Sequence, residues 1–167
     1  MKGYSDDGWN QYTGDMKQLG ERQITIDCDV LQADGGTRCA SITGGMVALT
    51  DAINGLLKKK VIAKNPLVQN VAAVSVGVCE GVPTLDLDYI HDSSAEVDLN
   101  VIMTDRGKFV ELQGCAEHKA FSDKDLAAMI RLAKKGLKKL FALQKKALRK
   151  EVRRSLLRYW RLRGRSR

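Results

Sequence analysis

Two short segments of the chain hold residue types that could together handle phosphate. In the first, ADGGTRCAS (33–41), two glycines precede Thr37 and Arg38, and a helical pattern follows. Glycines let backbone N–H groups turn toward an anion, a helix N-terminus adds about half a positive charge, and a guanidinium matches phosphate oxygens. The segment therefore suits a phosphate cradle, with hydroxyls from Thr37 and Ser41. The alternative is a tight turn with an N-cap Thr or Ser, because the spacing fits neither a Walker P-loop nor a dinucleotide fingerprint.

The second segment, LDLDYIHDSSAEVD, places five carboxylates within fourteen positions of a chain whose net charge is +8. In an extended strand Asp86 and Asp88 would share one face, and Asp92 could swing back toward Asp86 after a short turn. Such carboxylates can hold Mg²⁺, or keep one raised pKa for acid–base chemistry. Taken singly, each acid is also explained by simple exposure to solvent.

Together the two segments supply the groups that phosphoryl or nucleotidyl transfer requires. One positions a phosphate, and the other binds Mg²⁺, which neutralises the charge of the reacting phosphodiester. The charge distribution adds a polyanion partner, because residues 131–167 hold 16 lysines and arginines against one acid, Glu151. The alternative for this segment is a solvated helix face followed by a basic tail. The four cysteines lack CxxC spacing, which argues against a zinc site.

Five segments that must position these residues carry strand patterns. RQITIDCDVLQ alternates apolar and polar residues, as half-buried strands do, and VAAVSVGV is an almost continuous apolar run rich in β-branched residues, as central strands are. The expected strands lie at 22–32, 71–78, 84–89, 93–104 and 108–114, with a hairpin turn at 105–107. Ser93 with Glu96 matches a capping box for a helical turn that opens the fourth segment.

Two longer segments carry helical patterns. ASITGGMVALTDAINGLLKKK (40–60) repeats apolar residues at helical spacing, and Ser122 with Asp125 predicts a capping box that opens a second helix. The apolar stripe of this second helix runs from Leu126 to Gln144 and is flanked by lysine pairs. The pattern as a whole predicts an α+β fold in which helices pack against a mixed sheet.

Four ordered segments resemble bacterial ribonuclease PH: GERQITIDCDVLQADGGTRCASITG (20–44), NPLVQNVAAVSVGV (65–78), LDLDYIHDSSAEVDLNVIMT (85–104) and GKFVELQGCAEHKAFS (107–122). The resemblance implies a ribonuclease PH-like fold of the ribosomal S5 domain 2 type. It also implies a phosphate-dependent 3′-to-5′ exoribonuclease, or tRNA nucleotidyltransferase, that trims tRNA precursors, with rRNA as a further RNA partner. Inorganic phosphate would be the attacking substrate, nucleoside diphosphates the products, and a hexameric ring of dimers the assembly.

The resemblance also assigns roles to individual positions. Gly36, Thr37 and Arg38 match the family's phosphate-binding turn, so Thr37 and Arg38 would fix the attacking phosphate. Asp86 and Asp92 match its catalytic, metal-associated carboxylates, which would place Mg²⁺ and assist proton transfer at the leaving 3′ oxygen. Arg38 and Mg²⁺ would then supply the positive charge that offsets the two carboxylates.

The two ends of the chain depart from the family pattern. MKGYSDDGWNQYTGDMKQ stands where the family has opening strands, basic RNA-binding residues and a second phosphate-contacting arginine, so we expect a fold that lacks the N-terminal strands. The expected division is a divergent lead-in (1–18), a partial ribonuclease PH-like domain (19–148) and a basic C-terminal extension (149–167). The absence of a signal-type or membrane-length apolar run predicts a cytoplasmic protein with no membrane partner. The alternative function is a non-catalytic RNA-binding or assembly subunit, or an inactive fragment.

Overall fold

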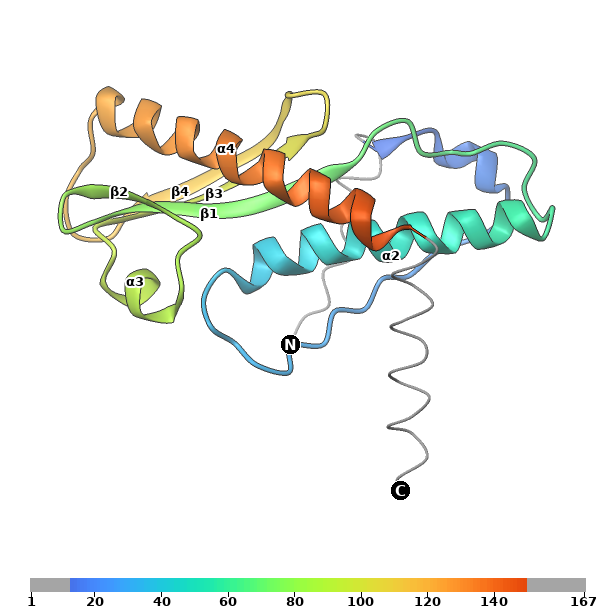
Figure 1. Cartoon of the computed structure of the whole chain (residues 1–167), viewed down its shortest axis with the longest axis horizontal. Helices are drawn as coiled ribbons and strands as arrows, with labels where there is room; N and C mark the ends of the chain where they lie inside the picture. The colour runs from blue at the N-terminus through green and yellow to red at the C-terminus, as the bar shows by residue number, and fades with distance from the viewer. Residues whose placement is uncertain (1–12, 150–167) are drawn as a thin grey trace, which may run out of the picture.

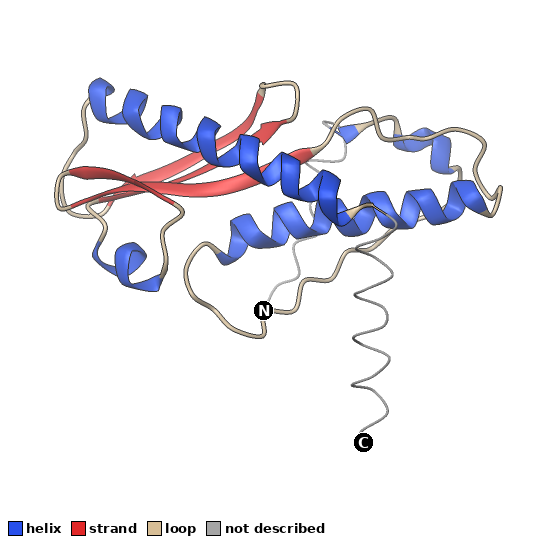
Figure 2. Ribbon diagram, in the orientation of Figure 1, coloured by secondary structure: helices blue, strands red, loops and turns tan. Residues whose placement is uncertain are grey.

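The computed structural model describes residues 13–149, so most of the expected lead-in and nearly all of the expected basic extension lie outside the described residues. The elements in chain order are η1 (Met16–Leu19), α2 (Thr37–Lys58), β1 (Val71–Cys79), β2 (Val82–Leu85), α3 (Tyr89–Ser94), β3 (Val97–Thr104), β4 (Phe109–Ala116) and α4 (Asp123–Ala147). Figure 1 shows α4 lying across the sheet, and Figure 2 separates its strands from the surrounding helices. The predicted α+β class is confirmed.

The four strands form one sheet in the order β2-β1-β3-β4, and every pair of neighbours is antiparallel. The pattern predicted a mixed sheet instead. The connections explain the difference: short turns join β1 to β2 and β3 to β4, and a parallel pair would need a crossover of a dozen or more residues. The predicted central strand and the predicted hairpin are both present, as β1 and as β3–β4.

The core explains why β1 and α4 were readable from the sequence. Alternate β1 residues such as Val74 and Val76 face α4, where they meet the buried Ala133 and Leu137. On the opposite face, Val71 and Ala73 of β1 pack with Cys39 of α2, so each long helix covers one side of the sheet. A nearly continuous apolar run in β1, which is covered on both faces, and a single apolar stripe on α4 are what this packing requires.

α4 begins and continues as its pattern predicted. Ser122 and Asp125 form the capping box that opens it. Near its other end the buried Gln144 donates its side-chain amide to the Thr43 and Val71 carbonyls, both at 3.0 Å. Gln144 therefore fastens α4 to α2 and to β1 at once. Within the described residues no helix is long and apolar enough to cross a membrane.

The predicted strand at 22–32 is wrong: the segment forms neither strand nor helix, and it pairs with no strand in the described part of the chain. Ile24 and Ile26 are half-buried against the cluster that includes Leu49 and Ile53, whereas Thr25 is exposed. The side-chain alternation was thus partly right. A strand also needs the hydrogen bonds of a neighbour, and these depend on distant parts of the chain.

The predicted strand at 84–89 is also wrong in extent, because β2 ends at Leu85. Asp86 follows with φ of 61°, in the left-handed region, so Asp86 and Asp88 do not alternate along one strand. Asp88 instead caps α3 by accepting a hydrogen bond from the His91 amide.

The capping box predicted from Ser93 is wrong as well, because α3 starts five residues earlier than the turn that this pattern implied. Ser93 sits inside α3 and donates to the Ile90 carbonyl at 3.1 Å. Glu96 instead accepts from the Gly81 amide at 2.8 Å, which ties the start of β3 to the β1–β2 turn.

Candidate functional site

A pocket of about 390 Å³ opens where α2 begins and β2 ends. It brings together the two segments from which chemistry was expected, although they lie some fifty residues apart in sequence. Its lining residues are Asp34, Gly35, Gly36, Cys39, Ala40, Thr43, Ala73, Val74, Asp86, Leu87, Asp88 and Leu140. The glycine turn forms one wall and the acidic segment the other.

Direct backbone contact holds these two walls together. Gly35 and Gly36 have φ of 79° and 56°, which a residue with a side chain rarely adopts. A Cβ atom at Gly35 would lie 2.3 Å from the Leu87 carbonyl oxygen, and one at Gly36 would lie 3.3 Å from Ser75 Oγ. Both positions therefore favour glycine for the turn, and Gly35 is also needed for its close approach to Leu87.

Ser75 fixes the acidic wall to the sheet. Its carbonyl accepts from the Asp86 amide at 2.8 Å, and its Oγ accepts from the Leu87 amide at 3.1 Å. Sequence reasoning missed this residue. The signal was present, because Ser75 is the single hydroxyl in the otherwise apolar run VAAVSVGV, and a buried hydroxyl needs partners.

The three carboxylates of the pocket differ in what they do. None of the described residues hydrogen-bonds the Asp86 carboxylate, so it is available to a ligand, whereas Asp88 Oδ1 lies 2.7 Å from His91 Nδ1. The His91 amide and then the His91 ring lower the pKa of Asp88, because both favour its ionised form. Asp88 is therefore a helix cap. Asp34, which sequence reasoning did not single out, is exposed at the rim.

Asp92 is not brought into the pocket. It lies on α3 with an exposed side chain and is absent from the pocket lining. Its charge acts on another carboxylate: burial, followed by the charges of Asp92 and Glu117, raises the pKa of Asp98. The structure thus joins Asp86, but not Asp92, to the glycine turn.

Arg38 is also directed away from the pocket. Its Nη2 donates to both carboxylate oxygens of Glu111 on β4, at 3.0 and 2.9 Å. The helix N-terminus and Gly36 lie at the pocket, but the side chains of Thr37 and Arg38 do not line it. The charge expected to offset Asp86 is therefore held by Glu111 in this arrangement.

Cys39 lines the pocket without being a nucleophile. Its Sγ donates to Asn100 Oδ1 at 2.8 Å, and burial raises the pKa of the thiol to about 12. Since the thiolate is the reactive form, Cys39 stays inert at neutral pH. Any chemistry in this pocket therefore falls to carboxylates and to backbone N–H groups.

The carboxylates of the pocket suit a Mg²⁺ ion that is held only partly by the protein. Carboxylate oxygens suit Mg²⁺, which keeps several waters and takes one or two carboxylates together with substrate phosphates. Asp86, with Asp34 beside it in the lining, matches that description. Across residues 13–149 no group of three or more His, Cys, Asp or Glu residues could hold a metal ion, so a cage built from protein ligands alone does not fit.

Comparison with known proteins places the chain in a class. Residues 13–53 match the 3′ exoribonuclease family, domain 1, and residues 69–136 match the 3′ exoribonuclease family, domain 2. The two matches together span well over half of the chain, which therefore belongs to the 3′ exoribonuclease family. The glycine turn comes from the first match and Asp86 from the second, so the pocket lies where the two meet.

Among solved structures, the crystal structure of rice (Oryza sativa) Rrp46 is similar, with a TM-score of 0.57 and 18% sequence identity. The similarity covers 71% of this chain and 51% of the rice chain, so this chain spans about half the length of that protein. At this identity the likeness concerns the fold alone, and it supports the ribonuclease PH-like fold.

Proposed function

We propose that this chain is a phosphate-dependent 3′-to-5′ exoribonuclease of the bacterial ribonuclease PH type, which trims the 3′ ends of tRNA precursors. The observation that carries the proposal is the contact of Gly35 with the Leu87–Asp88 backbone. It sets the N-terminus of the 22-residue helix α2 beside the Asp86 carboxylate. A helix N-terminus favours an anion, so the pocket offers an anion site next to a carboxylate.

In the proposed reaction an oxygen of inorganic phosphate attacks the phosphorus of the last phosphodiester. The bond from that phosphorus to the 3′ oxygen of the preceding nucleotide breaks, the oxygen gains a proton, and a nucleoside diphosphate leaves. The backbone N–H groups at the start of α2 hold the attacking phosphate, and Asp86 faces the reacting group. Mg²⁺ held at Asp86, with Asp34 of the same lining or the expected Asp92 of α3 as a second ligand, would neutralise charge on the phosphates.

The proposal also includes the RNA partner, the assembly and the cellular location. RNA is the partner, with tRNA precursors as the main substrate and rRNA as a second, and the active assembly is a homo-hexameric ring of dimers in the cytoplasm. The basic segment at 131–167 supports the choice of a polyanion.

The test is release of nucleoside diphosphate from a 3′-labelled tRNA precursor, with and without phosphate and Mg²⁺. We expect phosphate-dependent release that falls at least about 100-fold in Asp86→Asn, the scale on which acid–base groups act. Asp29→Asn is the matched control, because this exposed carboxylate lies on the extended segment away from the pocket lining. Full activity of Asp86→Asn, or equal loss in both variants, would contradict the assignment.

A second candidate function is a non-catalytic RNA-binding or assembly subunit. The placement of Arg38 on Glu111 and of Asp92 outside the pocket favours it, because two of the expected active-site groups are then elsewhere. It predicts RNA binding without product release, unaffected by Arg38→Ala. The release assay and a binding assay on the same preparation separate the two functions.

A further inference from the structure

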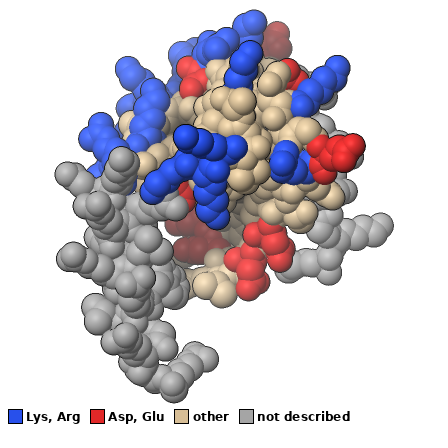
Figure 3. Space-filling view, turned by 90° about the vertical axis from the view of Figure 1, so that its right-hand side faces the viewer, with Lys and Arg blue, Asp and Glu red and all other residues tan. Residues whose placement is uncertain are grey.

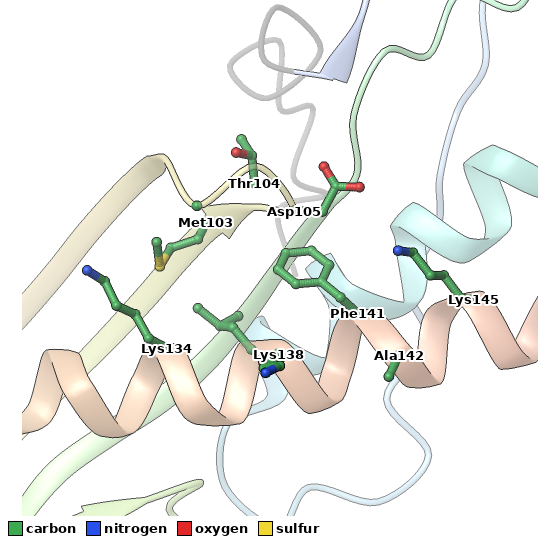
Figure 4. A pocket seen from close by; sticks show the side chains of 10 residues that line it. Met103, Thr104, Asp105, Lys134, Lys138, Phe141, Ala142 and Lys145 are labelled. Atoms are coloured by element: carbon green, nitrogen blue, oxygen red, sulfur yellow. The ribbon is translucent and has the colours of Figure 1, made fainter.

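A second pocket, of about 490 Å³, lies between α4 and the turn that joins β3 to β4 (Figure 4). It shares no lining residue with the candidate functional site. The residues around it are Met103, Thr104, Asp105, Gly107, Lys134, Leu137, Lys138, Phe141, Ala142 and Lys145. Three of these ten residues are lysines, so the pocket would attract an anionic ligand.

The lining of this pocket carries a net positive charge, with three lysines against one acid. Lys134, Lys138 and Lys145 are exposed, and none forms an ion pair with a described carboxylate. The one acid in the lining, Asp105, accepts from Asn70 Nδ2 at 3.0 Å through its Oδ2, and its single charge offsets only one of the three lysines. Figure 3, which views the molecule from the right-hand side of Figure 1, shows Lys and Arg gathered over the upper part of that face, with some Asp or Glu among them.

The length of the lysine row selects an extended ligand. Lys134 and Lys145 are eleven residues apart on α4, which at 1.5 Å per residue is roughly 16 Å along the helix. Figure 4 shows Lys134, Lys138 and Lys145 spaced along the helix, with Phe141 between the last two. A single small anion could meet the neighbouring Lys134 and Lys138 but not Lys145 as well, whereas a chain of phosphates could meet all three.

Aromatic and apolar groups accompany the charges. Met103 and Leu137 are buried at the base of the pocket, and Phe141 is half-buried. Phe109 at the start of β4 is 42% exposed, and its ring centroid lies 5.3 Å from Lys134 Nζ. Phe109 is accessible because α4 packs mainly on β1 and β2, so that the β4 side of this sheet face stays open.

We propose that this surface, formed by Lys134, Lys138, Lys145, Phe109 and Phe141, binds the backbone and bases of single-stranded RNA outside the candidate functional site. Proteins that bind single strands without sequence preference combine a basic groove with aromatic rings on which bases stack. The partly exposed Phe109 ring beside a row of lysines with net positive charge favours RNA over an acidic protein surface, because an acidic protein would make no use of the ring. The proposal rests on the proposed function for the kind of ligand, because it adds a second contact for the same RNA.

The chain offers a matched pair of variants. The pocket triple replaces Lys134, Lys138 and Lys145 by glutamine and removes three charges from the pocket. The control triple replaces Lys135, Lys139 and Lys146 by glutamine and removes three charges from the neighbouring positions of the same helix. All six lysines are exposed, and the second three are not in the lining. Both triple variants of the full chain therefore carry the same net charge and the same remote basic segments. Circular dichroism melts verify that each retains the fold.

The measurement is fluorescence anisotropy of a labelled 20-nucleotide oligo(A) without phosphate, over a range of salt concentrations. With a slope of about −0.7 per phosphate contact for single strands, loss of three contacts flattens the salt dependence by roughly two units and weakens binding about 100-fold at 0.1 M salt relative to 1 M. We expect this change in the pocket triple and a clearly smaller one in the control triple. Phe109→Leu should weaken binding further without altering the salt slope.

Equal losses in the two triple variants would overturn the proposal, as would displacement of the oligonucleotide by poly-glutamate at the same charge concentration. The release assay separates this proposal from the proposed function. Salt-dependent binding at the pocket without product release supports the RNA surface and contradicts the enzyme. Product release with identical binding by both triples supports the enzyme and contradicts the RNA surface.

Discussion

Substitution of Gly35 tests whether the glycine turn is held against the acidic segment, which is the contact on which the candidate site depends. Gly35 has φ of 79°, and a Cβ atom there would lie 2.3 Å from the Leu87 carbonyl oxygen and 2.7 Å from the Asp88 carbonyl carbon. Both contacted atoms belong to the backbone, so neither can turn away as a side chain could. Gly35→Ala must therefore strain the turn and also push the two walls of the pocket apart.

The size of the effect follows from these two terms. An alanine in the left-handed region costs about 1–2 kcal/mol, and overpacking adds about 1–3 kcal/mol, so Gly35→Ala should destabilise the fold by about 2–5 kcal/mol. Gly107 provides the control, because it has the same φ of 79° but nothing within 4 Å of its would-be Cβ. Gly107→Ala should therefore lose only the first term, about 1–2 kcal/mol.

Urea titration followed by circular dichroism gives both free energies of unfolding, and thermal melts give a second measure at about 2–4 °C per kcal/mol for a chain of this size. Phosphate binding by calorimetry should weaken in Gly35→Ala and stay unchanged in Gly107→Ala. Equal destabilisation by the two substitutions would refute the reasoning, because it would mean that Gly35 does not press on the Leu87–Asp88 backbone.

Three further outcomes follow from individual side chains. Burial raises the pKa of the Asp98 carboxyl, so the folded chain binds a proton more readily than the unfolded chain and loses stability as pH rises from 3.8 through the raised pKa. Asp98→Asn should raise the Tm at neutral pH, because it removes the negative charge of a carboxylate whose Oδ1 is buried without a hydrogen bond. A lower Tm would contradict this. Glu111→Gln should tighten phosphate binding in calorimetry by up to about fivefold, the worth of a partly exposed ion pair, and a second change, Arg38→Gln, should abolish that gain. Iodoacetamide should alkylate the exposed Cys28 of the native chain well before Cys39, whose pKa is raised to about 12, and equal rates in peptide mass spectrometry would show that the pocket does not bury Cys39.

Elements that bury apolar residues in a simple period were predictable from the sequence. β1 is apolar at nearly every position because helices cover both faces, and α4 shows one apolar stripe because only one side packs. The segment at 22–32 shows where this reasoning ends. Its Ile24 and Ile26 do pack inward, but whether a strand forms depends on a neighbour that no local pattern reveals.

The site was predictable only in part, for a similar reason. The residue types in ADGGTRCAS and in the acidic segment indicated phosphate chemistry, and the fold brings Gly36 and Asp86 to one pocket. The direction of a side chain is a different matter. Arg38 pairs with Glu111, which lies 73 residues further along the chain, and Asp86 turns into the left-handed region after β2 ends early. Neither event leaves a signal in the neighbouring residues.

The charges of the pocket lining connect these observations. Three carboxylates and no lysine, arginine or histidine line the pocket, and the start of α2 contributes only about half a positive charge. An inorganic phosphate entering this arrangement would meet net repulsion. Positive charge must therefore come with the ligand, as a bound divalent cation, or from Arg38 once it leaves Glu111. The Glu111→Gln comparison separates these sources: a gain in phosphate affinity assigns the charge to Arg38, whereas affinity that depends only on Mg²⁺ assigns it to the metal and leaves the Arg38–Glu111 pair as a link between α2 and β4.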